Sequence, residues 1–170
     1  VRGLFYYRLA NYFGGVPLVL HALDASSDLD IPRATAEETW AQVSKDFAEA
    51  AEALPVRWSA PADQGRPTKL SALGFLAKTY LWQKKYQEAV TVSEQIIDSG
   101  EHELLPSFRS VFSEDNEHNR EILFATQFLG GNDGEGNNLP IRTAPRGAPV
   151  QFTGSGAWSN FVPQTHWVAA

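Results

Sequence analysis

Residues 68–100 read TKLSALGFLAKTYLWQKKYQEAVTVSEQIIDSG, and this stretch contains two helix patterns separated by a short polar turn. The first pattern spaces its apolar residues three and four apart, and Thr68 or Ser71 can cap its amino end. After the turn at Lys84-Lys85, a second apolar pattern runs over residues 86–98. Helices joined by so short a turn must lie antiparallel, so the stretch predicts an αα-hairpin.

The hairpin has the small and large apolar positions of a tetratricopeptide-like repeat. Ala77 and Ala89 are small enough to let the two helices approach closely, and Tyr80 and Tyr86 are expected to fill the space beside them. Because one such repeat cannot bury its hydrophobic face alone, we expect neighbouring helices. On this motif alone, an ordinary αα-hairpin is an equally good interpretation.

Two further helices are predicted before the hairpin. Residues 4–13 form a dense apolar and aromatic helix pattern that ends at Gly14-Gly15. Thr35 and Glu38 have the spacing of a capping box, and the helix that they begin ends before Pro55. The predicted buried stripe of this helix consists of Trp40, Val43, Phe47, Ala50, Ala51 and Leu54.

The pattern changes after residue 100. Residues 104–112 predict a short helix or an irregular packed segment, and residues 121–128 alternate partly, which predicts a short strand. Residues 130–160 are rich in Gly, Asn, Pro and Ser and predict long irregular structure. The predicted fold class is therefore mainly α, a tetratricopeptide-like helical scaffold with long irregular loops and few short strands.

The composition excludes several classes of function. The 170 residues include 14 Lys and Arg against 20 Asp and Glu, which argues against a nucleic-acid partner. The absence of cysteine excludes disulfides and thiolate chemistry, and no apolar run reaches the ~18 residues of a membrane span. Methionine is also absent, and Val1 lies inside a helix pattern, so we expect the chain to be a piece of a longer protein.

Six short segments in a fixed order carry a resemblance to a known family. They are YYRLANYFGGVPL (6–18), PRAT (32–35), DFAEAAEALP (46–55), GRPTK (65–69), AKTYL with YQEA (77–81 and 86–89) and NREILF (119–124). In this order they resemble the SusD/RagB family of outer-membrane nutrient-binding lipoproteins, over residues 1 to about 128. The chain departs from the family pattern at Phe47, where leucine is usual, and residues 163–165 match a family proline-threonine motif only loosely.

The resemblance implies a domain organisation. Residues 1–100 correspond to part of the SusD-like N-terminal helical region, with the tetratricopeptide-like hairpin at residues 68–99. Residues 101–170 correspond to the start of the loop-rich C-terminal region.

The resemblance also implies a function without catalysis. Such a protein binds a glycan or a peptide at the cell surface and delivers it to a SusC-like TonB-dependent outer-membrane transporter. It is held at the outer membrane by a lipid on an N-terminal cysteine that this sequence does not contain. No cofactor, metal or catalytic residue is expected. A helical protein–protein interaction module and, less favoured, a glycoside hydrolase are the alternatives.

Sugar binding requires exposed aromatic faces, on which the C–H groups of a pyranose pack, and polar side chains for the hydroxyl groups. Trp58 and Trp158 lie among Gly and Pro residues and are candidates, with packing beneath a loop as the alternative. Trp40 and Trp82 lie within helix patterns and are expected in the core. The polar candidates are Asn132, Asp133, Asn137 and Arg142.

The residues that usually carry hydrolysis or bind metals are poorly placed in this sequence. The acidic pairs Glu37/Glu38, Glu101/Glu103 and Glu114/Asp115 lie in charged contexts typical of a solvated surface, not of two opposed catalytic carboxyls. The four histidines are too scattered for a local zinc motif, and residues 132–137 do not fit the EF-hand calcium pattern.

Overall fold

The computed structural model describes residues 1–24, 29–113 and 116–127. The chain divides into two compact units, Val1–Ala125 and Thr126–Ala170, and every described helix lies in the first unit. The helices are α1 (Arg2–Phe13), α2 (Ala36–Ala53), α3 (Lys69–Trp82), α4 (Tyr86–Asp98) and α5 (Phe108–Val111), with a 3-10 turn η1 (Pro61–Asp63). The predicted mainly α fold is confirmed, whereas the predicted division at residue 100 stays a prediction.

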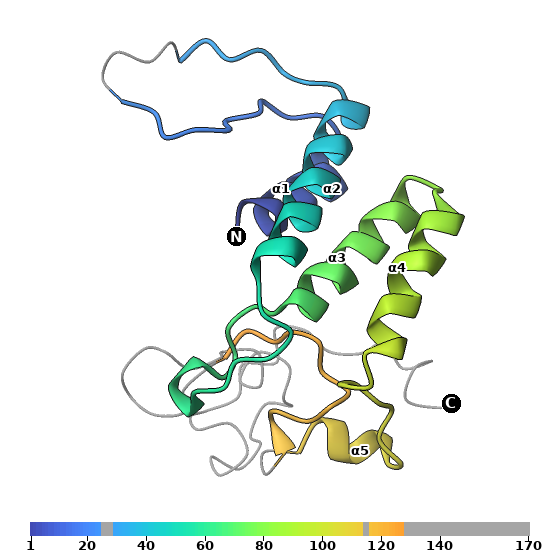
Figure 1. The fold of residues 1–170 in the computed structure, drawn as a ribbon. Coiled ribbons are helices and arrows are strands. Elements are labelled where there is room, and N and C mark those ends of the chain that lie inside the picture. The colour runs from blue at the N-terminus through green and yellow to red at the C-terminus, as the bar shows by residue number, and fades with distance from the viewer. Residues whose placement is uncertain (25–28, 114–115, 128–170) are drawn as a thin grey trace, which may run out of the picture. The chain divides into compact units, whose positions relative to one another are not determined.

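The four long helices pack in chain order. Helix α2 packs against both α1 and α3, and α3 packs in turn against α4 (Figure 1). The chain reverses between α3 and α4, where Lys84 adopts a positive φ of 60° and the Lys85 amide donates to the Tyr80 carbonyl at 2.9 Å. The predicted αα-hairpin is therefore confirmed.

Side chains of the predicted capping residues start both central helices. The Glu38 amide donates to Thr35 Oγ1 at 3.1 Å, and the Thr35 amide donates to the Glu38 carboxylate at 2.8 Å. The hydrogen bond from the Thr35 amide and, as a smaller effect, the one from the Thr35 hydroxyl lower the pKa of Glu38. For α3 the capping residue is Thr68, and Ser71 completes the reciprocal pair of hydrogen bonds. These caps satisfy amide groups that the helix itself leaves without partners.

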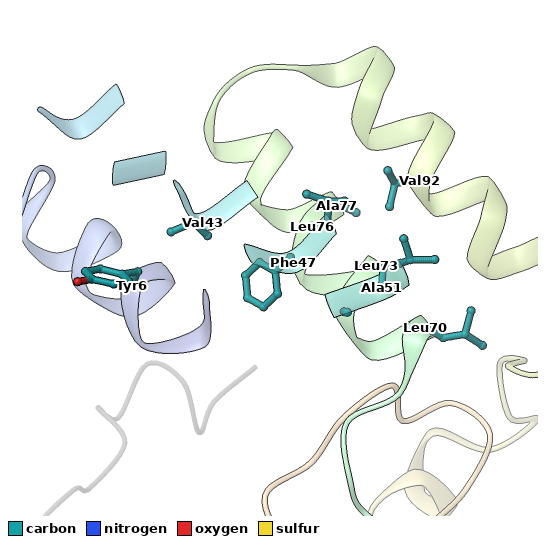
Figure 2. Packing of buried hydrophobic residues seen from close by; sticks show 10 residues of the cluster. Tyr6, Val43, Phe47, Ala51, Leu70, Leu73, Leu76, Ala77 and Val92 are labelled. Atoms are coloured by element: carbon teal, nitrogen blue, oxygen red, sulfur yellow. The ribbon is translucent and has the colours of Figure 1, made fainter. Parts of the chain in front are cut away.

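The core lies between α2 and α3 and extends to α1 and α4. Val43, Phe47 and Ala51 of the predicted α2 stripe are buried, and Trp40, Ala50 and Leu54 are half-buried against them. Figure 2 shows this cluster, to which α1 contributes Tyr6, α4 contributes Val92, and α3 contributes Leu70, Leu73, Leu76 and Ala77. The apolar spacing of α2 therefore predicted its buried face correctly.

Two aromatic residues at the end of the hairpin differ from the prediction. Tyr80 is half-buried as expected, but Tyr86 is exposed and does not fill the space between the helices. Tyr86 is the first residue of α4, and helical side chains tilt toward the amino end of their helix. Its side chain therefore extends past the contact between α3 and α4.

The predicted strand at residues 121–128 is wrong over its described part, since residues 121–127 contain no strand. The Glu121 and Ile122 amides donate instead to the side chain and carbonyl of Asn119, at 3.0 and 3.2 Å. Leu123 packs on the core and Phe124 packs edge-on against Phe75 of α3, so these apolar side chains contact the helices without a paired strand. The only β pairing in the described part of the chain is an isolated bridge between Pro17 and Arg33.

An ion pair joins the start of α1 to the middle of α2. The Arg2 guanidinium donates two hydrogen bonds to Asp46, at 2.6 and 2.9 Å, and a third to the Leu20 carbonyl. The Asp46 side chain is only 6% exposed. Burial alone would raise the pKa of Asp46, but the hydrogen bonds from Arg2 and Gln42 outweigh it and the pKa is lowered.

Replacing Asp46 with asparagine is expected to cost about 1–2 kcal/mol of the free energy of unfolding at neutral pH. Because the pKa of Asp46 is lower in the folded state, its contribution is complete above the ordinary value of about 3.9 and disappears as pH falls through the folded value. Urea unfolding should therefore show the difference between variant and wild type shrinking below about pH 4. Glu49→Gln, at an exposed pair with Lys45, is the control and should change little at any pH. A difference that does not depend on pH would contradict the role of the ion pair.

Candidate functional site

The candidate residue Trp58 lies in the loop between α2 and α3. Pro55 follows the last turn of α2, and the Lys69 amide at the start of α3 donates to the Pro55 carbonyl at 2.8 Å. This bond closes a loop of residues 55–69 that contains η1. The loop is thus held at its base by the two helices that form most of the core.

Within this loop the Trp58 side chain is half-buried and held on two sides. Its Nε1–H donates to the Pro67 carbonyl at 2.9 Å, and the Arg66 guanidinium carbon lies 5.8 Å from its ring centroid. Arg66 in turn forms an ion pair with Asp63 of η1, at 3.2 Å. The indole N–H is therefore already used, and a ligand can contact Trp58 only through its remaining ring surface.

The structure does not test the other sequence-based candidates. Trp58 is the one candidate whose surroundings are described. The remaining five lie outside the described residues: Trp158, Asn132, Asp133, Asn137 and Arg142.

Trp82 is not in the core, contrary to the expectation from its helix pattern. It is the last residue of α3 and is 57% exposed. One face of its indole stacks on Trp40 of α2, with centroids 6.5 Å apart and planes at 13°. Its Nε1–H donates to Tyr7 Oη of α1 at 3.1 Å. We call Trp82, Trp40 and Tyr7 the aromatic stack.

Periodicity alone could not place Trp82. A helix pattern identifies one apolar face but does not show where the neighbouring helix stops covering it. The sequence did contain a signal for the exposure of Trp82, because this residue comes directly before the polar turn Gln83-Lys84-Lys85 and therefore lies at the end of its helix. At the end of a helix, a large side chain has a neighbouring helix on one side and solvent on the other.

In each described acidic pair, at least one carboxylate has a structural partner. Glu38 caps α2, Glu101 lies 3.7 Å from Arg57, and Glu103 lies 2.9 Å from Arg120. Glu114 and Asp115 lie outside the described residues. Across residues 1–24, 29–113 and 116–127, no three His, Asp or Glu side chains come together as a metal-binding group would require. None of the helices in these ranges is both long and apolar enough to cross a membrane.

Comparison with known proteins agrees with the helical array. A SusD-like family model, described as "Starch-binding associating with outer membrane", matches residues 1–81. SusD-like protein P2 of Formosa agariphila is 28% identical over 170 residues, which cover 95% of this chain and 33% of the relative. A laminarin-binding SusD-like protein of known structure superposes with a TM-score of 0.78 at 26% identity, covering 86% of this chain and 35% of the other. A SusD-like carbohydrate-binding protein of Bacteroides fragilis gives 0.69 at 28% identity, covering 75% and 25%.

These findings define the chain first as a helical scaffold of the SusD type. The family model, the curated relatives and the solved structures together support a fragment of a SusD-like protein, as the sequence segments indicated. It spans about a third of the length of the curated relative from Formosa agariphila.

Proposed function

We propose that the protein binds oligosaccharides at the surface of the outer membrane and has no catalytic activity of its own. The observation that carries this proposal is the match of residues 1–81 to a family described as starch-binding and associated with the outer membrane. The structural similarity to proteins named for laminarin and carbohydrate binding supports the same class of ligand. The first test is calorimetric titration of the whole protein with oligosaccharides from starch and from laminarin. Binding without release of reducing sugar supports the proposal, and no binding to any glycan contradicts it.

The proposal includes a partner and an anchor. The bound glycan passes to a SusC-like TonB-dependent transporter, and a lipid on an N-terminal cysteine outside this sequence holds the protein at the membrane. Both follow from membership of the family and not from a contact in this chain. Purification from outer membranes tests them together, because the protein should copurify with a large β-barrel protein and carry a lipid.

The ligand-binding residues that we propose combine rings with polar groups. The rings of Trp58 and Trp158 would stack against pyranose C–H faces, while amide, carboxylate and guanidinium groups bond the hydroxyls. The polar residues proposed are Asn132, Asp133, Asn137 and Arg142. Of the whole set, Trp58 has a described geometry, in which its loop orients the ring before ligand arrives.

Replacing Trp58 with alanine is expected to weaken glycan binding by about three- to ten-fold, because the stacking surface is lost. Titration calorimetry with the preferred oligosaccharide measures the change. Trp58→Phe keeps an aromatic ring but loses the hydrogen bond to the Pro67 carbonyl. Comparing it with Trp58→Ala therefore distinguishes the effect of ring stacking on affinity from the effect of that hydrogen bond within the loop. Unchanged affinity in the alanine variant, with its unfolding midpoint preserved, would remove Trp58 from the binding site.

A protein–protein interaction module is the second candidate function. It is favoured by the exposed aromatic pair Phe108 and Phe112 at α5, whose rings meet edge-on at 5.2 Å. Large apolar side chains at the surface are typical of contacts with protein. Replacement of both rings with serine should abolish copurification of a protein partner and leave glycan affinity unchanged if this candidate holds.

A further inference from the structure

We propose that Trp82 forms a sugar-stacking surface on the helical scaffold itself, at the end of the α3–α4 hairpin and separate from the loop candidates. The ligand is a pyranose ring of an oligosaccharide, which packs its apolar C–H face on the exposed part of the indole. This proposal rests on the glycan-binding function proposed above and adds a site to it.

Trp82 contacts Trp40 on one side and is still largely exposed. The inner face stacks almost parallel on Trp40, with planes at 13°. With planes nearly parallel but centroids 6.5 Å apart, the two rings overlap only in part, and Trp82 as a whole is 57% exposed. An exposed aromatic ring offers apolar surface against which the C–H groups of a pyranose can pack.

The aromatic stack holds Trp82 in one orientation. Its N–H donates to Tyr7 Oη at 3.1 Å, and the Tyr7 ring packs edge-on against both Trp40 and Phe75, at 5.7 and 6.0 Å. Phe75 in turn stacks on the buried Phe47 at 5.3 Å. The series of rings therefore connects the exposed indole to the core through three helices. A surface that is ordered before binding loses little conformational entropy on binding, which favours affinity.

Polar groups flank this surface and suit a hydroxylated ligand. Lys78 lies one helical turn before Trp82 and is exposed, so both side chains lie on the same face of α3. Gln83 follows directly, and its amide nitrogen donates to Ser44 Oγ at 2.7 Å. Aromatic surface beside a few fixed polar groups is the usual composition of a small-ligand site. Because Trp82 already spends its own N–H on Tyr7, neighbouring side chains must supply the hydrogen bonds to sugar hydroxyls.

The decisive experiment titrates the whole protein with oligosaccharides from starch and from laminarin, comparing wild type with Trp82→Ala. We expect affinity to fall about ten-fold or more, equivalent to about 1.4 kcal/mol, with little change in the unfolding midpoint. Trp82→Phe should retain most of the affinity, because a smaller ring can still stack on Trp40. Leu81→Ala is the matched control, since Leu81 is a neighbouring exposed apolar residue with 53% exposure and no part in the stack.

A second measurement covers the case in which the alanine variant folds poorly. The indole N–H resonance of Trp82, assigned by its absence from Trp82→Phe, should shift in wild-type protein on saturation with glycan. Equal affinity of Trp82→Ala and wild type, or an unshifted resonance at saturation, would overturn the proposal while leaving glycan binding intact. If Trp82 bound a protein partner in place of a glycan, both measurements would give these results, and the proposal would likewise be overturned. Failure of wild type to bind any glycan would instead overturn the function on which this site rests.

Discussion

Gly15→Ala is expected to destabilise the protein by about 3 kcal/mol or more, because the backbone that leads into the first residue of α2 leaves no room for a methyl group. A Cβ at this position would lie 2.7 Å from the carbonyl carbon of Thr35 and 2.9 Å from the amide nitrogen of Ala36. It would lie closer still to the carbonyl oxygen of Ala34. All three atoms belong to the backbone, so no flexible side chain can move aside.

The close approach at Gly15 is part of a junction that fixes how α1 leads into α2. The Arg33 side chain donates to the carbonyls of Gly15 and Phe13, at 2.7 and 2.6 Å. The Ala34 amide donates to the Val16 carbonyl, and the Val16 amide donates to Thr39 Oγ1. A shift of the backbone that accommodated a methyl group would therefore break several hydrogen bonds at once.

Chemical denaturation of Gly15→Ala and wild type measures the expected loss. Gly100→Ala is the matched control, because Gly100 has a positive φ of 67° but nothing lies within 4 Å of the added Cβ. It should cost only about 1 kcal/mol, the ordinary strain of a left-handed residue. If both variants lost a similar free energy of unfolding, the backbone around Gly15 would be able to move aside for a methyl group, and the prediction would be wrong.

The parts of the fold that could be predicted from sequence are those determined by neighbours along the chain. Thr35 and Glu38 are three residues apart, and their reciprocal hydrogen bonds need nothing else to form. The buried face of α2 likewise follows from the 3.6-residue period of a helix, which places Val43, Phe47 and Ala51 together. In these cases the local chemistry and the tertiary structure lead to the same result.

The parts that could not be predicted depend on what lies beside a residue in space. Trp82 and Tyr86 fit helix patterns, but their exposure depends on where the neighbouring helices end. The apolar alternation near Leu123 indicated a strand, yet no second strand pairs with residues 121–127. The hydrogen bond from Trp58 to Pro67 spans nine residues and has no sequence signal. For the candidate site, sequence could supply residue types but not which ring is open to a ligand.

Phe47→Ala is expected to cost about 3–5 kcal/mol of the free energy of unfolding, because it removes the ring at which three helices meet. Phe47 is 7% exposed and stacks on Phe75 of α3 at 5.3 Å with planes at 9°. A Cβ added to Gly3 of α1 would lie 3.4 Å from the same ring, so α1 approaches Phe47 closely on its other side. Removing the ring leaves a cavity between helices that are fixed by their own contacts and cannot fully collapse into it.

Denaturant unfolding at neutral pH measures this loss, and two further variants define its cause. Phe112→Ala removes the same ring from a residue that is 73% exposed and should change the free energy of unfolding by less than about 0.5 kcal/mol. Phe47→Leu introduces the residue usual in the family and keeps most of the buried apolar volume, so it should cost less than about 1.5 kcal/mol. If Phe47→Leu were as damaging as Phe47→Ala, the stacking on Phe75 would contribute more than the filling of space. We expect stability to increase from Phe47→Ala to Phe47→Leu to wild type, because the buried volume at position 47 determines most of the free energy that is lost.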